Sequence, residues 1–245
     1  MSDRIQPASL HAYRESPRPF LLDLFCGAGG AAMGYANAGF DVIGVDIKRQ
    51  PRYPFPFIQG DAMEVGRALL ATGRIDAVHA SPPCQAYSDM KHMPDAKQHP
   101  ELVEPVREML QEWGGPYAIE NVEGAPLLDP ITLCGSMFDL GVLGFQLRRH
   151  RLFESNVALL PPRDCAHRQP TIGIYGGHVR CRSKKFWRDT AADFPGYDKP
   201  TLACAAMGAG WMTMGELSEA IPPAYTQHVG AQLLAVIESE ATDAA

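Results

Sequence analysis

A cysteine on a rigid turn is the first candidate for chemistry in this chain. Cys84 lies in the run Ser81-Pro82-Pro83-Cys84-Gln85, directly behind the apolar segment 75–80. That segment predicts a short buried strand, and the prolines end it because neither can donate a ladder hydrogen bond. Open α/β sheets bind ligands at the carboxyl ends of their strands, which suits a nucleophile. A buried structural cysteine is the alternative, and both interpretations stay open.

A second apolar run, 117–122, carries Glu120 and Asn121 near its carboxyl end. A carboxylate on a buried strand is costly unless it is paired or takes part in chemistry. Beside a candidate nucleophile we favour catalysis, and the alternative is a Glu-Asn pair that caps or braces a loop.

Basic side chains gather in the segment 146–153. If this segment is a strand, its period of two places Arg149 and Arg151 on one face and Arg148 and His150 on the other, so that one face can enter the site. Arginines that blunt the edge of a sheet are the ordinary alternative.

The segment that begins at Phe20 has the pattern of a nucleotide-binding start. The apolar run 20–25 predicts a strand, and Cys26-Gly27-Ala28-Gly29-Gly30 leads into a helix of small residues through Ala38. The glycines allow a ligand to approach the backbone, and the helix N-terminus offers free N–H groups. A tight contact between helix and sheet would explain the same glycines.

Two aspartates follow the next predicted strands. Asp46 ends the strand 41–45, nineteen positions after Gly27, where an acid can accept both hydroxyls of a ribose; a solvated turn aspartate is the alternative. Asp61 precedes a predicted helix over 62–71. It can accept from an adenine amino group or cap that helix, and the two roles are compatible.

The segment 154–210 has a looser pattern. Its stretch 178–188 contains no acidic residue and five basic ones: Arg180, Arg182, Lys184, Lys185 and Arg188. Such a stretch can contact phosphates, but taken alone it is more simply interpreted as a solvated basic loop. Cys165-x-His167 and His178-x-x-Cys181 do not have the spacing of a common structural zinc site, so no metal is predicted.

Composition indicates a soluble globular protein. The 245 residues are 46% hydrophobic, enough for one large α/β domain with at most a small insertion. No apolar run approaches about eighteen residues, and no N-terminal signal pattern is present. Six cysteines without a framework spacing indicate a reducing cytoplasm. The net charge of −6 argues against a wholly basic nucleic-acid coat protein.

Taken together, these residues resemble the DNA cytosine-5 methyltransferases. The resemblance covers about residues 20–155 and rests on the runs 23–30, 81–85, 120–122 and 149–151, which occur in the order of that family. The segments 147–154 and 220–225 look like the short, phage-encoded members. Protection of a phage genome and partnership with a restriction nuclease both stay open as roles. Two departures are Leu147 in place of a glutamine that braces a loop, and Glu219-Ala220 in place of a Gly-Asn pair of the cofactor pocket.

The resemblance implies an S-adenosylmethionine-dependent, Rossmann-like methyltransferase α/β fold, with a mostly parallel sheet and helices on both of its faces. It implies a flexible leader (1–19), a catalytic and cofactor-binding domain (20–155), a small irregular target-recognition region (156–210) and a C-terminal helix (211–240) that returns to the catalytic domain. The residues it assigns to the cofactor S-adenosylmethionine are Phe25, Cys26, Gly27, Gly29, Gly30, Asp46, Ile47, Asp61, Ala62 and Pro83.

The implied reaction is methylation of C5 of a cytosine flipped out of double-stranded DNA, by a monomer and without a metal. Cys84 would add to C6, Glu120 would grip the base, Arg151 would bind O2, and Arg149 would support the loop and the base. DNA contacts are expected from Gln85, Ser88, Arg180, Arg182, Lys184, Lys185 and Arg188.

Three other functions remain as alternatives. A tRNA cytosine-5 methyltransferase would use the same chemistry, although the Cys-Phe-Thr signature expected of that branch is missing. A NAD-linked oxidoreductase is suggested only by the glycine turn and Asp46. A non-catalytic relative that binds DNA or cofactor would fit the altered segment at Glu219-Ala220.

Overall fold

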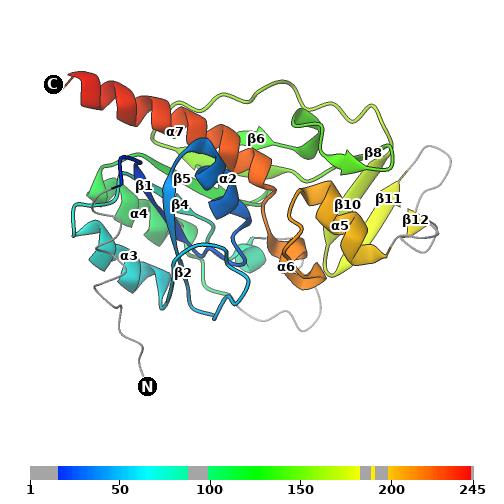
Figure 1. Cartoon of the computed structure of the whole chain (residues 1–245), viewed down its shortest axis with the longest axis horizontal. Coiled ribbons are helices and arrows are strands. Elements are labelled where there is room, and N and C mark those ends of the chain that lie inside the picture. The colour runs from blue at the N-terminus through cyan, green and yellow to red at the C-terminus, as the bar shows by residue number, and fades with distance from the viewer. Residues whose placement is uncertain (1–15, 88–98, 183–188, 191–197, 244–245) are drawn as a thin grey trace.

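Two sheets organise the chain (Figure 1). The computed structural model describes residues 16–87, 99–182, 189–190 and 198–243. The larger sheet has seven strands in the order β3-β2-β1-β4-β5-β9-β6. These strands are β1 (Phe20–Leu24), β2 (Asp41–Asp46), β3 (Phe57–Gln59), β4 (Ala77–Ala80), β5 (Tyr117–Asn121), β6 (Ile131–Leu133) and β9 (Arg151–Ser155).

The first five strands in sequence are mutually parallel, and β9 runs antiparallel to both β5 and β6. From β1 the chain moves outward to β2 and β3 and then crosses back to β4 on the other side of β1. The strand order therefore reverses between β1 and β4, which is where open α/β sheets bind their ligands. The mostly parallel sheet predicted from the sequence is confirmed.

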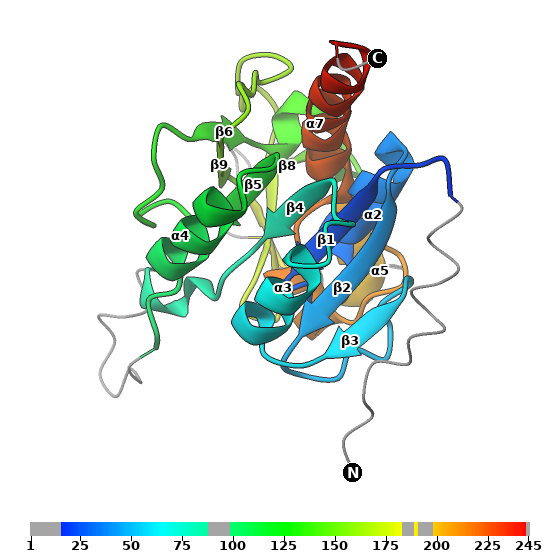
Figure 2. The same cartoon turned by 90° about the vertical axis from the view of Figure 1, so that its left-hand side faces the viewer.

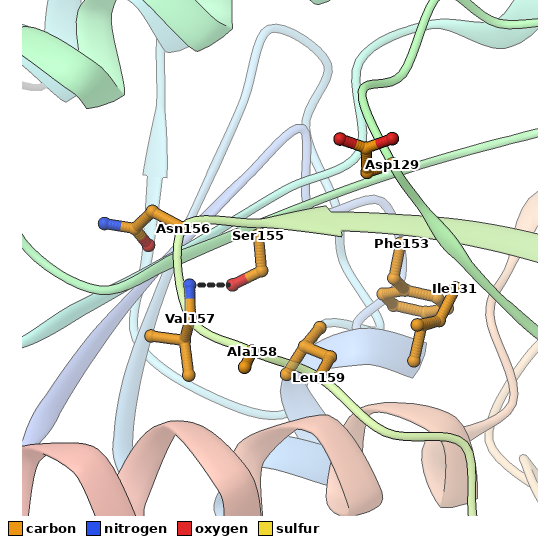
Figure 3. Close-up of a pocket in the computed structure, with 8 residues that line it drawn as sticks. All are labelled: Asp129, Ile131, Phe153, Ser155, Asn156, Val157, Ala158 and Leu159. Carbon is orange, nitrogen blue, oxygen red and sulfur yellow. Dashed lines mark hydrogen bonds between the residues drawn. The ribbon is translucent and has the colours of Figure 1, made fainter.

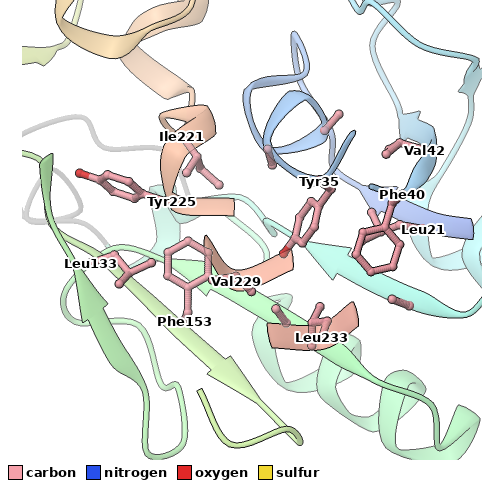
Figure 4. Packing of buried hydrophobic residues seen from close by; sticks show 14 of the residues in the cluster. Leu21, Tyr35, Phe40, Val42, Leu133, Phe153, Ile221, Tyr225, Val229 and Leu233 are labelled. Atoms are coloured by element: carbon pink, nitrogen blue, oxygen red, sulfur yellow. The ribbon is translucent and has the colours of Figure 1, made fainter. Parts of the chain in front are cut away.

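Helices cover both faces of the large sheet (Figure 2). On one face α2 (Gly30–Ala38) and α7 (Pro223–Asp243) pack against Leu21 (Figure 4). On the other, α3 (Ala62–Leu70) and α4 (Val103–Trp113) pack against Leu22 and Leu24. Successive side chains of β1 thus enter opposite cores, as the period of a strand requires.

The smaller sheet has the order β12-β11-β10-β8-β7. Its strands are β7 (Gly141–Val142), β8 (Phe145–Leu147), β10 (Thr171–Tyr175), β11 (His178–Arg182) and β12 (Asp189–Thr190), and it packs against α5 (Lys199–Met207). Gly176 and Gly177 have positive φ of 57° and 71°, as a tight hairpin between β10 and β11 requires.

The described part of the region expected to be irregular contains three strands and a helix. Ile172 and Ile174 alternate into a shared core with α5, a strand signal that the proline-rich surroundings obscured. Two strands of this sheet, β7 and β8, come from before residue 155. The proposed boundary between 155 and 156 consequently passes through the sheet and stays a prediction.

The single strand expected across Arg148 to Arg151 is wrong. β8 ends at Leu147 in the small sheet, and β9 begins at Arg151 in the large one. Residues 148–150 link the two sheets, so the period of two does not continue through them. The reason is that Leu147 and Phe153 are buried in two different cores.

A buried ion pair joins α4 to β9. Arg107 Nε lies 2.6 Å from Glu154 Oε1, and both side chains are almost fully buried. Arg107 also donates to the carbonyl of Pro126, while Glu154 Oε2 accepts from the backbone N–H of Leu128. The pair therefore fixes the loop before β6 as well as the helix.

Glu154→Gln is expected to lower the free energy of unfolding by about 2–3 kcal/mol, because the buried guanidinium of Arg107 then keeps only the exposed Glu104 as a charged partner. Chemical denaturation measures this loss. Glu112→Gln is the matched control, since its pair with Arg67 is solvent-exposed and should contribute less than about 0.5 kcal/mol. Equal losses in both variants would contradict the structural role of the buried pair.

Among the residues that the structure describes, no helix has the length and apolarity needed to cross a membrane.

Candidate active site

The Cys84 loop lies over the carboxyl end of β5. Because β4 and β5 pair in parallel, with Ala80 opposite Ile119, the segment after β4 emerges beside Glu120 and Asn121. Asn121 Nδ2 donates to the Pro82 carbonyl at 2.8 Å, and this bond is buried. Asn121 therefore braces the proline turn, as the structural alternative for the Glu-Asn pair anticipated.

Glu120 is paired with the arginine that begins the neighbouring strand. Arg151 Nε lies 3.0 Å from Glu120 Oε1, and only 7% of the Glu120 side chain is exposed. This contact is an ion pair without hydrogen-bond geometry, so that Glu120 oxygen has no hydrogen bond within the described part of the chain. Burial raises the pKa of Glu120, while Arg151 and the Ser81 hydroxyl oppose the rise. A buried carboxyl with spare hydrogen-bonding capacity is suited to hold a ligand.

Cys84 shares the electrostatic environment of this pair. It is half-buried at the start of a short 3₁₀ turn, η2 (Cys84–Ala86). Burial raises the pKa of the thiol, Arg151 lowers it, and Glu120 raises it further. Arg151 thus acts on both the thiol and the carboxyl. The structure places Cys84, Glu120 and Arg151, which lie far apart in sequence, around one site.

Arg149 has a different environment from Arg151. It is 5% exposed and donates to the backbone oxygens of Ile174 and Ser218, and its own carbonyl accepts from the Tyr225 hydroxyl at 2.7 Å. Burial and the neighbouring Arg151 lower the pKa of Arg149 to about 9. These bonds join β10, α6 (Met214–Glu219) and α7 to the link between the sheets. Its contacts are those of a positioning residue.

The glycine loop combines an open position with a packed one. Gly27 has φ +50°, and a Cβ placed there would meet nothing within 4 Å. At Gly30 a Cβ would collide with the backbone oxygen of Ile221. Space for a ligand therefore lies over Gly27, whereas Gly30 allows the C-terminal segment to pack closely. The tight-contact interpretation is confirmed at Gly30, and the ligand interpretation stays a prediction at Gly27.

Other contacts hold this loop in place. The Trp211 indole donates to the Ala28 carbonyl at 2.9 Å. Phe25 has a left-handed backbone with φ 58°, and Gly29 has φ 85°. Cys26 is buried, and burial raises the pKa of its thiol far above the ordinary value. Cys26 is therefore unsuited to act as a nucleophile.

Asp46 orders the two loops that it joins. Its carboxylate accepts from the Gly27 N–H at 3.0 Å and from the Lys48 N–H at 2.8 Å. The next side chain, Ile47, is 66% exposed. A large exposed aliphatic residue beside an acid and a glycine loop offers an apolar surface for a ring.

Asp61 caps α3, which confirms the capping role. Its Oδ1 accepts from the Met63 and Glu64 N–H groups at 2.9 and 3.0 Å. Its other carboxylate oxygen has no hydrogen bond to the described residues, so a ligand contact remains compatible with the cap. Ala62 is buried in the first turn of the helix, and Pro83 precedes η2 directly.

His79 is a residue of the site that we did not single out from the sequence. It is buried in β4, where its Nδ1 pairs with the Tyr35 hydroxyl at 3.0 Å and its Nε2 with Ser81 Oγ at 2.8 Å. Burial lowers the pKa of His79 to about 3, so the ring is neutral. These bonds fix the Ser81 hydroxyl that acts on Glu120. A histidine inside the apolar run 75–80 was the available signal.

The predicted DNA contacts are only partly described. Gln85 is exposed beside Cys84, and the Arg180 guanidinium lies 5.4 Å from the ring centroid of Tyr175. Arg182 belongs to β11. The other predicted contacts lie outside the described residues: Ser88, Lys184, Lys185 and Arg188. The basic surface therefore stays a prediction.

A separate pocket lies around the end of β9 (Figure 3). Its lining includes Phe153, Ser155 and Leu159. Ser155 pairs with Ala118 near the start of β5, so the pocket lies toward the amino ends of the parallel strands. None of the candidate catalytic residues contributes to it, and we assign it no function.

Comparisons with known proteins agree with this arrangement. Residues 20–126 match the model of the C-5 cytosine-specific DNA methylases. A curated relative, the type II methyltransferase M.AgeI of Thalassovita gelatinovora, is 30% identical over 118 residues, which are 42% of this chain and 28% of that protein. The chain thus aligns with little more than a quarter of that relative.

Two solved structures have the same overall fold. An E. coli protein encoded within a prophage, described as a DNA modification methyltransferase, has a TM-score of 0.59 at 16% identity, over 90% of this chain and 99% of that one. The Dnmt2 methyltransferase of S. pombe has a TM-score of 0.59 at 12% identity, over the same shares.

The fold is thus that of the methyltransferases. Over residues 20–126 the chain is similar to the C-5 cytosine-specific DNA methylases. The candidates Cys84 and Glu120 lie inside this matched segment, while Arg149 and Arg151 lie beyond it.

Proposed function

We propose that this chain is a DNA cytosine-5 methyltransferase that modifies a cytosine flipped out of double-stranded DNA, with S-adenosylmethionine as methyl donor. The observation that supports this most directly is the buried pair of Glu120 and Arg151 beside the half-buried thiol of Cys84. A nucleophile, a hydrogen-bonding acid and a cation at one strand edge are what this reaction needs.

Cys84 would activate the base. Cytosine C5 is a weak nucleophile, so the thiolate first adds to C6 and forms an S–C6 bond. The C5=C6 double bond is then lost, and the ring becomes an enamine whose C5 is nucleophilic. S-adenosylmethionine supplies, when bound, the electrophilic methyl group that the activated C5 takes. Loss of the C5 proton then restores the double bond and expels the Cys84 sulfur.

Glu120 and Arg151 would hold the base during this addition. Burial raises the pKa of Glu120, which favours the protonated carboxyl. In that form Glu120 donates to N3 and accepts from the exocyclic amine. Arg151 would bind O2 and stabilise the charge that develops on the ring.

The residues around the glycine loop fit the cofactor. Open space lies over Gly27, and the exposed Ile47 follows Asp46 directly. The spare carboxylate oxygen of Asp61 can accept from an adenine amino group. Asp46 already accepts two backbone N–H groups, and its remaining lone pairs can accept from ribose hydroxyls.

The target base must leave the helix because C6 is inaccessible in stacked DNA. Flipping costs a few kcal/mol, which phosphate contacts from the basic stretch 178–188 would offset. We assign target recognition to the region 156–210, together with the strands β7 and β8 that share its sheet. Its small size indicates a recognition sequence of only a few base pairs.

Methyl transfer assays test the proposed function. Purified protein with labelled S-adenosylmethionine should label double-stranded DNA and leave tRNA unlabelled, and bisulfite sequencing should locate the product at cytosines in one short sequence. Methyl label in tRNA alone would instead establish a tRNA cytosine-5 methyltransferase. Absence of transfer to either substrate, with cofactor binding intact, would favour the non-catalytic relative.

A further inference from the structure

Two cysteines and two histidines converge next to Arg149 and Arg151. The ligand atoms of Cys134, His150, Cys165 and His167 all lie within 4.8 Å of one another. We name these four residues the Cys₂His₂ cluster. From it we propose that the chain binds one Zn²⁺ ion in a structural site, and this proposal does not depend on the proposed function.

The distances within the cluster match a tetrahedral site. Cys134 Sγ lies 3.3 Å from His167 Nε2, and Cys165 Sγ lies 3.4 Å from Nε2 of both His150 and His167. Tetrahedral zinc, with bonds of about 2.3 Å to sulfur and about 2.0–2.1 Å to nitrogen, places its sulfur and nitrogen ligands about 3.5 Å apart.

Hydrogen bonds alone do not account for this convergence. Nε2 of His167 is approached by the sulfurs of both Cys134 and Cys165, yet an imidazole nitrogen offers either one N–H or one lone pair. A metal ion satisfies all four atoms at once, because the two thiols lose their protons to solvent and the two imidazoles bind as neutral rings.

A carboxylate outside the cluster supports the same assignment. Glu123 Oε1 lies 3.3 Å from Nδ1 of His150. This contact places the ring proton on Nδ1 and leaves the lone pair of Nε2 directed at the cluster, as is usual for zinc-bound histidine. With four protein ligands the coordination is complete, which is typical of structural zinc and leaves no position for a catalytic water.

The ion would join three segments that are separate in sequence. Cys134 follows β6, His150 lies in the link between β8 and β9, and Cys165 and His167 lie between β9 and β10. His150 is flanked by Arg149 and Arg151, so the ion would fix the link that presents Arg151 to Glu120. In this site Cys165 and His167 are joined by Cys134 and His150, and not by His178 and Cys181 as considered from the sequence. The proposal therefore replaces the expectation that the chain binds no metal.

Metal analysis of the full-length protein tests the site. After incubation with Zn²⁺ and removal of excess metal, we expect about one zinc per chain, and Cys165→Ser should retain less than about a fifth of that amount. Cys204→Ser is the matched control, because Cys204 is a free, half-buried cysteine outside the cluster. It should retain the full amount.

Cobalt substitution provides a readout on the unmodified chain, which excludes misfolding of a variant as the cause. Co²⁺ in the cluster should show the visible bands of tetrahedral coordination and a thiolate-to-metal charge-transfer band, and Zn²⁺ should displace it. Failure to bind zinc, a cobalt spectrum without thiolate bands, full zinc content in Cys165→Ser, or a disulfide between Cys134 and Cys165 would each overturn the proposal.

Discussion

Replacement of Cys84 by serine is expected to reduce methyl transfer by about 10⁴-fold or more, because a serine hydroxyl does not supply the anion that adds to C6. Binding of S-adenosylmethionine should be retained, since the glycine loop is held by Asp46 and Trp211 and not by Cys84. Single-turnover rates with labelled cofactor and an equilibrium binding measurement give the two quantities.

Cys204→Ser serves again as the control and should keep the unmodified rate. If Cys84→Ser remained folded but lost the cofactor as well as the activity, Cys84 would belong to the cofactor pocket. If it kept its rate, the covalent mechanism would be wrong.

Glu120→Gln should lower the single-turnover rate by about 10²–10³-fold while DNA binding stays within a few fold. A glutamine amide can still donate to N3 and accept from the exocyclic amine, but it cannot transfer a proton as charge develops on the ring. Comparison of DNA affinity with the single-turnover rate separates these two roles. A loss confined to DNA binding would make Glu120 a specificity residue only.

The pH dependence of this effect has a defined sign. Burial raises the pKa of Glu120, and the protonated form that the mechanism uses is lost as the pH rises through that value. Because Glu120 also raises the pKa of the Cys84 thiol, each rate is first divided by the thiolate fraction of Cys84 measured in that protein. The corrected rate of the unmodified protein divided by that of Glu120→Gln should then fall with increasing pH. A ratio that is constant or rises with pH would contradict a protonated Glu120.

The strands of the large sheet and their functional ends could be predicted from the sequence. Parallel strands buried on both faces are continuous apolar runs, so β1, β4 and β5 stand out, and polar residues at their ends are conspicuous. Cys84 after two prolines and Glu120 inside an apolar run are such residues. Their meeting required only that neighbouring parallel strands end at the same edge.

The remaining features depend on contacts between distant segments. The sequence could not show that the chain changes sheets between Leu147 and Arg151, because local periodicity does not say which core a side chain enters. His79 is satisfied by Tyr35, which lies on a helix of another segment. The ligands of the proposed zinc site extend from Cys134 to His167, so no short spacing motif identifies them.

Trapping of the base on DNA tests whether Cys84 forms a covalent bond to the target cytosine. Double-stranded DNA that carries 5-fluorocytosine at the target position, once bisulfite sequencing has identified that position, blocks loss of the substituent from C5. With S-adenosylmethionine present, we expect a covalent protein–DNA adduct whose peptide map places the bond on Cys84. An active enzyme that forms no adduct, or an adduct on another cysteine, would contradict it.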